Sequence, residues 1–126
     1  MGKGKSEALL TLDSRGLLRI PERLFSRANG SNELKLYCVK GESGKSCLKI
    51  VSSRHPFAQN LKESKTASPD SLGRIRIPKE LIAQAELYCG GKVLVTGGSH
   101  LEVWHPANYD LEWKAVLEAA GIEATP

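Results

Sequence analysis

Short stretches in which apolar and polar residues alternate run along most of this chain, and turn-forming residues separate them. The most regular is Arg74–Ile77, where two arginines alternate with two isoleucines and so occupy opposite faces of a strand. Leu17–Ile20 has a related pattern. Strands are also expected at Leu9–Leu12 and, less regularly, near Lys65–Ala67. The pattern therefore predicts a protein built mainly from short β-strands.

Glycine-rich segments between apolar strands predict two β-hairpins. The hairpins join strands 34–39 and 47–51 through Gly41–Gly44, and strands 92–96 and 101–104 through Gly97-Gly98.

Helical periodicity is expected in three places. Proline opens a helix without losing a hydrogen bond, so short helices should start at Pro21 and Pro78, and Asn29-Gly30 should end the first. A C-terminal helix should run from about Tyr109 to Ala120 and stop at Gly121. The apolar stripes are Leu24, Phe25 and Ala28 in the first helix, Leu81, Ile82 and Ala85 in the second, and Trp113, Val116, Leu117 and Ala120 in the third.

The chain contains an internal repeat. Asp13–Leu24 (DSRGLLRIPERL) matches Asp70–Leu81 (DSLGRIRIPKEL) at seven of twelve positions, with residue numbers that differ by 70 − 13 = 57. Chance would give roughly one identity. The likeness continues at Leu36–Val39 with Val93–Thr96, and at Leu48–Ile50 with Leu101–Val103.

Each repeat is too small to bury a core alone, so strands of one half must complete the other, or a partner subunit. We expect a pseudo-twofold, interleaved β-barrel with short helices, and a homo-oligomer. The expected division is a flexible basic arm (residues 1–7), a first repeat (8–53), a linker (54–67), and a second repeat with the C-terminal helix (68–126).

Charge is unevenly distributed along the 126 residues. Residues 1–98 carry 17 Lys/Arg and 9 Asp/Glu, whereas residues 99–126 carry 1 and 5, within a total net charge of +4. A basic body is typical of a protein that places one surface against a polyanion such as DNA. No run approaches the roughly 18 apolar residues of a membrane span, and three cysteines do not form a secreted disulfide framework. We expect a cytoplasmic, nucleoid-associated protein with no membrane partner.

Basic residues at the two turns and on the strands after them are the candidate DNA contacts. A two-stranded β-ribbon fits the major groove, and arginine can bind guanine or phosphate. The alternative is that these residues are solvated charges or partners of Asp13, Asp70 and Glu80, in which case Asp70 would pair with Arg74 across the turn. The candidate contacts are Arg15, Arg19, Arg74, Arg76 and Lys79, with Arg23 and Arg27 available in the first copy, and the turn residues are Asp13, Gly16, Asp70 and Gly73.

Other constellations predict no chemistry. The segment Gly41–Ser46 (GESGKS) lacks the first glycine of a phosphate-binding loop and precedes a strand, so a hairpin turn is favoured over a nucleotide enzyme. Cys89, His100 and His105 do not make a zinc set, and His55 and His105 are expected in loops. Cys38 and Cys47 are expected to face each other as thiols across the first hairpin. We expect no catalytic residue, no metal and no cofactor.

The stretch Asp70–Leu81, with the later closing strand Leu-Glu-Val-Trp-His-Pro, resembles the MraZ family of the AbrB/MazE-like superfold. That family carries Asp-x-x-x-Arg in each of two repeats. Asp70 and Arg74 satisfy the pattern, whereas Leu17 replaces the arginine of the first repeat. The second repeat also has residues that are usual there in the family: Gly97, Glu102, Trp104 and Tyr109.

The resemblance implies a β-rich α+β fold: a two-repeat AbrB/MraZ-like double-split (swapped-hairpin) β-barrel with short helices and a C-terminal helix, in a ring-like or dimeric homo-oligomer. It implies a sequence-specific transcriptional regulator that binds double-stranded DNA at direct repeats upstream of a division and cell-wall gene cluster. The alternative is an antitoxin-like interaction module that uses the barrel to dimerise. Its acidic C-terminal segment, with Trp113, would bind a partner protein.

Overall fold

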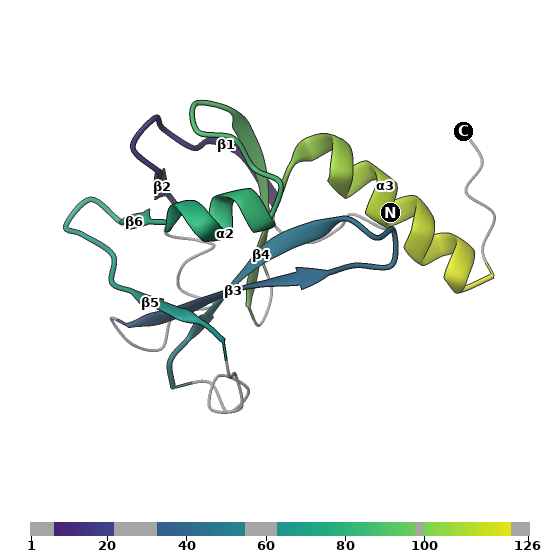
Figure 1. Ribbon diagram of the computed structural model, residues 1–126, viewed down its shortest axis with the longest axis horizontal. Coiled ribbons are helices and arrows are strands. Elements are labelled where there is room, and N and C mark those ends of the chain that lie inside the picture. The colour runs from purple at the N-terminus through teal and green to yellow at the C-terminus, as the bar shows by residue number, and fades with distance from the viewer. Residues whose placement is uncertain (1–6, 22–32, 55–62, 98–99, 122–126) are drawn as a thin grey trace.

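The computed structural model describes residues 7–21, 33–54, 63–97 and 100–121 (Figure 1). The predicted helix after Pro21, with Arg23 and Arg27, lies outside these residues, as does His55. The described part contains eight short strands and two helices. They are β1 (Glu7–Thr11), β2 (Leu17–Arg19), β3 (Leu34–Lys40), β4 (Ser46–Ser52), β5 (Lys65–Ala67), β6 (Arg74–Arg76), α2 (Lys79–Gln84), β7 (Lys92–Thr96), β8 (Leu101–Trp104) and α3 (Pro106–Ala119).

The strand order has internal symmetry. Six strands form one antiparallel sheet in the order β1-β7-β8-β4-β3-β5, and β2 pairs with β6 in a separate two-stranded ribbon. In the two repeats, β1 corresponds to β5, β3 to β7 and β4 to β8. Replacing each strand by its counterpart gives the order β5-β3-β4-β8-β7-β1, which is the same sheet read from its other edge. The hairpin of each repeat therefore pairs with the first strand of the other, β7 with β1 and β3 with β5. This confirms that the two halves complete each other in a β-rich α+β fold. Within the described residues the sheet has two edges, β1 and β5.

A pseudo-twofold axis relates the two halves. The strand pairing about this axis shows which residues of the two repeats are equivalent, and it differs from the alignment expected from the sequence. Val93 pairs with Leu10, and Leu34 pairs with Ala67, the counterpart of Leu10. Leu34 is therefore the equivalent of Val93, and their numbers differ by 93 − 34 = 59. The expected match of Leu36 with Val93 is wrong by two positions, because the second repeat is longer by two between its proline and the strand that follows.

On this axis, Lys49 of β4 lies opposite Glu102 of β8, and their side chains form an ion pair of 3.4 Å. The Trp104 indole Nε1 also donates to Glu102, at 2.9 Å. Burial raises the pKa of Glu102, but the hydrogen bond from Trp104 and the charge of Lys49 outweigh it and hold the pKa below its ordinary value. The central pair of the sheet thus joins opposite charges from the two halves.

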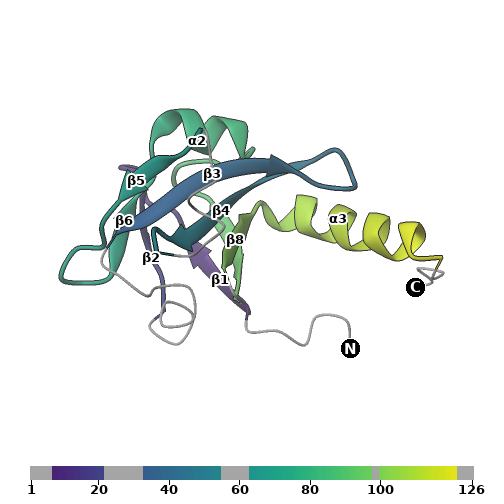
Figure 2. The same cartoon turned by 90° about the horizontal axis from the view of Figure 1, so that it is seen from below.

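The core lies between one face of the sheet, the β2–β6 ribbon and α2 (Figures 1 and 2). The ribbon contributes its inward-facing residues, and α2 contributes the predicted stripe of Leu81, Ile82 and Ala85. α2 follows β6 closely in the chain, and its apolar stripe packs in the same core as the ribbon and the sheet. The ribbon's share of the core is Leu18, Ile20, Ile75 and Ile77.

The first hairpin has its predicted strands but not its predicted register. Lys40 pairs with Ser46, which places Cys38 opposite Leu48 and Val39 opposite Cys47. The expectation that the two cysteines face each other is therefore wrong by one position, and a shift of one position moves a side chain to the other face of the sheet. Cys38 faces α2, and burial raises its pKa to about 11. Both are free thiols.

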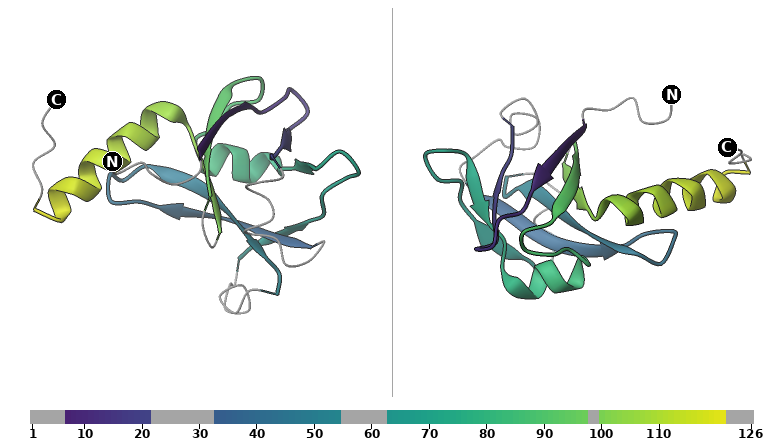
Figure 3. Two further views of the ribbon diagram at one scale, coloured as in Figure 1. Left: turned by 180° about the vertical axis from the view of Figure 1, so that it is seen from behind. Right: turned by 90° about the horizontal axis from the view of Figure 1, so that it is seen from above.

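The C-terminal helix begins earlier than predicted, at Pro106 rather than near Tyr109. His105 lies in the connection between β8 and α3, as expected, and is also the N-cap of the helix, because its Nδ1 accepts a hydrogen bond of 3.1 Å from the Ala107 N–H. None of the residues of α3 is buried. The helix projects from the end of the molecule opposite the ribbon (Figure 3). Within the described residues, no helix is both long enough and apolar enough to cross a bilayer.

Candidate nucleic-acid interface

The two Asp-Ser-x-Gly turns have one backbone structure. The Asp13 carboxylate Oδ1 accepts hydrogen bonds from the backbone N–H groups of Arg15 and Leu17, at 2.8 and 2.9 Å. Asp70 does the same for the two equivalent N–H groups, at 2.9 Å for both bonds. Gly16 and Gly73 have φ angles of +82° and +77°, which favour glycine. The aspartate and the glycine therefore define the turn in both repeats.

Both aspartates remain charged at neutral pH. Hydrogen bonds from backbone N–H groups, chiefly that of Leu17 for Asp13 and that of Arg74 for Asp70, lower the pKa of each carboxyl below its ordinary value of 3.8. Hydrogen bonding to the charged form of an acid has this effect. Each turn thus presents a carboxylate whose second oxygen is available to an arginine.

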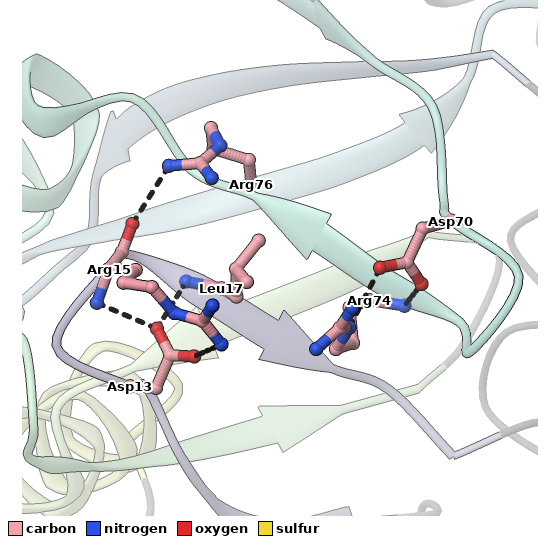
Figure 4. Close-up of polar contacts among 6 residues, drawn as sticks. All are labelled: Asp13, Arg15, Leu17, Asp70, Arg74 and Arg76. Carbon is pink, nitrogen blue, oxygen red and sulfur yellow. Dashed lines mark hydrogen bonds and ion pairs between the residues drawn. The ribbon is translucent and has the colours of Figure 1, made fainter.

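The ribbon between the turns carries arginines on its outer face (Figure 4). Leu18 pairs with Ile75 and both point inward, so their neighbours point outward. On the outer face Arg19 lies opposite Arg74, and Leu17 lies opposite Arg76. The predicted alternation of arginine and isoleucine in β6 is confirmed.

At the second turn, Asp70 positions the Arg74 guanidinium. Nε of Arg74 donates to Oδ2 of Asp70 at 2.7 Å, and the arginine side chain is 34% exposed. This is the pair across the turn that the sequence suggested. Within the described part of the chain, the two terminal nitrogens of Arg74 make no hydrogen bond. Asp70 thus holds Arg74 through Nε, and the two terminal nitrogens of the guanidinium are available to a ligand.

At the first turn, the pairing is different. Leu17 stands where the second repeat has Arg74, and Asp13 binds Arg15 instead, through Nη2 at 3.3 Å. The Arg15 side chain is 65% exposed, about twice the exposed fraction of Arg74. The backbone carbonyl of Arg15 also accepts a hydrogen bond of 3.1 Å from Nη1 of Arg76. Arg15 therefore supplies the cation that Leu17 lacks, at the tip of the turn rather than on the ribbon face.

Two further candidate residues are exposed. Arg19 lies on the outer face and makes no hydrogen bond or ion pair within the described ranges. Lys79 is the first residue of α2 and follows the last ladder bond of the ribbon, from the Ile77 N–H to the Gly16 carbonyl. The structure places Arg19, Arg74 and Arg76 on the outer face of the ribbon, Arg15 at the adjoining turn, and Lys79 just beyond the end of the ribbon.

The segment that resembled a phosphate-binding loop is the turn of the first hairpin, and it binds an anion that belongs to the chain itself. The Glu112 carboxylate of α3 accepts hydrogen bonds from the N–H groups of Glu42 and Ser43 at 3.1 and 3.0 Å, and from the Ser43 hydroxyl at 2.9 Å. A Cβ at Gly41 would overlap this carboxylate. Nothing local in the sequence pointed to Glu112, which is distant from the hairpin along the chain.

Within the described residues, no three His, Cys, Asp or Glu side chains are grouped as metal ligands. His105 caps α3, and its ring lies edge-on to Tyr88.

Neither a protein-family model nor a curated protein matches this chain.

Proposed function

We propose that this protein is a sequence-specific DNA-binding transcriptional regulator that lays the β2–β6 ribbon in the major groove. The observation that carries the proposal is the outer face of the ribbon, which carries Arg19, Arg74 and Arg76, with Arg15 at the adjoining turn; turn aspartates hold Arg15 and Arg74. A two-stranded antiparallel ribbon fits the major groove, and a guanidinium reads guanine O6 and N7 or binds phosphate.

The arginines divide into roles by how they are held. Arg74 is half-buried and fixed through Nε, so its free terminal nitrogens are ready to bind a base edge without further ordering. Arg15 and Lys79 are exposed beyond the ribbon face and suit phosphate contacts, which position the protein without reading sequence. Arg19 and Arg76 flank the centre of the ribbon and serve either role.

We extend the proposal to the type of barrel, the oligomer, the DNA site and the location of the protein in the cell. The interleaved hairpins support a double-split, swapped-hairpin barrel of the AbrB/MraZ type, completed by further copies of the chain. A homo-oligomer would present several copies of the ribbon to direct repeats in the DNA. In the MraZ family, which the turns resemble, such repeats lie upstream of a division and cell-wall gene cluster. We propose a cytoplasmic, nucleoid-associated protein on the same grounds.

The test is a titration of the full chain against a duplex from its own upstream region at low and at physiological salt. Affinity should fall steeply with salt, because each neutralised phosphate contributes about 0.9 to the slope of log K against log salt. R74A/R76A should weaken binding by about 10- to 1000-fold. K114A removes one charge from exposed α3, far from the ribbon, and should bind like the wild type. Salt-independent binding, or equal binding by R74A/R76A, would refute the proposal.

A second candidate function has an observation of its own. α3 has no buried residue, and it exposes Leu111 and Val116, at 46% and 38%. An antitoxin-like module would use this acidic helix to hold a partner protein, in the manner of an amphipathic helix in a groove. Co-purification of a small basic protein that L111K/V116K releases, together with no binding of upstream DNA, would favour this function.

A further inference from the structure

The two turns have the same backbone structure, but arginine and leucine have changed places between them: the first reads Asp-Ser-Arg-Gly-Leu and the second Asp-Ser-Leu-Gly-Arg. Arg15 and Leu72 are equivalent, and so are Leu17 and Arg74, because the turns have matching hydrogen bonds and the ribbon pairs symmetrically about Leu18 and Ile75. The ribbon is therefore nearly twofold in its backbone and asymmetric in its outward chemistry.

Leu17 is a partly exposed aliphatic side chain among cations. It lies on the outer face opposite Arg76, whose guanidinium is fixed on the Arg15 carbonyl beside it. If this face meets DNA, Leu17 faces the base edges at the place where the twofold would put a second Arg74. A leucine cannot donate to guanine, but it makes apolar contact with the C5-methyl group of thymine.

We infer that a single ribbon reads a non-palindromic site, with guanine under Arg74 and thymine under Leu17 at the position related to it by the ribbon axis. This inference rests on the proposed DNA-binding function. A twofold-symmetric reader selects a palindrome because the operator mirrors the symmetry of the protein. Leu17 and Arg74 are thus the residues that set the direction in which the ribbon lies on DNA.

The first experiment selects duplexes from a random library with the wild type and with R15L/L17R. The variant gives the first turn the pattern of the second (Asp-Ser-Leu-Gly-Arg) without changing composition or net charge. The wild type should select guanine on one side of the site and thymine on the other. R15L/L17R should select guanine on both sides and bind the wild-type site about 5- to 150-fold more weakly, the range for one mismatched contact. An unchanged, asymmetric selection overturns the inference.

The second experiment leaves the protein fold untouched. Replacing the selected thymine by uracil removes only the methyl group, and should weaken wild-type binding about fourfold, the value of one buried methyl group. L17A should bind the thymine and uracil duplexes equally. Equal binding of both duplexes by the wild type overturns the role of Leu17 even if R15L/L17R does not fold. Failure of the wild type to bind any duplex refutes the proposed function instead, so the two failures are distinguishable.

Discussion

The two Asp-Ser-x-Gly turns have the same backbone structure and present different side chains outward. Their aspartates accept the same two backbone hydrogen bonds, and their glycines have nearly the same φ. The first holds an exposed arginine at its tip, and the second holds a half-buried arginine on the ribbon face. A turn defined by its aspartate and glycine leaves the positions between and after them free to change. The same local structure can then serve two chemical purposes.

The turns also differ in what surrounds their glycines. A Cβ at Gly16 would lie 3.1 Å from the Ile77 carbonyl oxygen and 3.4 Å from Cδ1 of Ile82. At Gly73 the nearest atom among the described residues would be the Ile20 carbonyl oxygen, at 3.9 Å. Among the residues that the structure describes, the strand carbonyl opposite the glycine therefore lies closer at the first turn than at the second, and Ile82 of α2 also approaches Gly16.

The largest expected difference between the turns is in DNA affinity. If the ribbon binds DNA as proposed, Arg74→Ala should cost about 1–3 kcal/mol of binding free energy and relax the preference for guanine, because it removes the proposed base contact. Arg15→Ala should cost less than about 1 kcal/mol, evenly across sequences, and reduce the salt slope by about one. Binding isotherms on matched and mismatched duplexes measure both effects. Equal losses for the two variants would mean that their arginines have the same role.

Glycine replacement should separate the turns by a smaller amount. Gly73→Ala should destabilise the protein by about 1 kcal/mol, the cost of positive φ for an L-residue. Gly16→Ala should cost about 1 kcal/mol more, because its methyl group also crowds the Ile77 carbonyl. Urea unfolding followed by circular dichroism measures both. A larger loss for Gly73→Ala would contradict the asymmetric packing.

The smallest expected effect is the response of the turns to acid. The pKa of each aspartate is lower in the folded state than the ordinary 3.8, so each contributes stability that is complete above that value. This contribution is lost as the pH falls through the folded pKa. The NMR chemical shifts of the Leu17 and Arg74 amide protons report on the carboxylates that they bind, and they should change with a midpoint below pH 3.8.

Asparagine variants give the control for this titration. Asp70→Asn and Asp13→Asn keep a carbonyl acceptor for the backbone and remove the acid titration at their own turn only. Asp70→Asn should also free the Arg74 side chain, whose bond to the carboxylate is 2.7 Å, more than Asp13→Asn frees Arg15, at 3.3 Å. Titration of both amides in either variant would show that the turns are coupled.

Much of the fold could be predicted from the sequence because its signals are local. The alternation in Arg74–Ile77, the turn chemistry of Asp and Gly, and the hairpin glycines each act over a short stretch of chain, and the structure has the strands they predict. The candidate arginines of the ribbon could be identified for the same reason. The repeat further indicated that two small halves must share one core.

Contacts between distant residues decided the rest. The register of the first hairpin, which separates Cys38 from Cys47, follows from the burial of Leu36, Leu48 and Ile50 on one face. The Glu112 cap on the hairpin turn joins two segments that are far apart in the sequence. These outcomes depend on which surfaces meet in space, and no local pattern specifies that.

The sequence by itself determined the two turns, the alternating strands and the need for interleaving, because backbone propensity and side-chain periodicity act over short distances along the chain. Only the tertiary structure decided that β2 and β6 pair, and that Leu17 and Arg74 occupy equivalent places on one outward face. Equivalence across a pseudo-twofold axis is a relation between segments from different halves of the chain, and it exists only once the two halves have folded together.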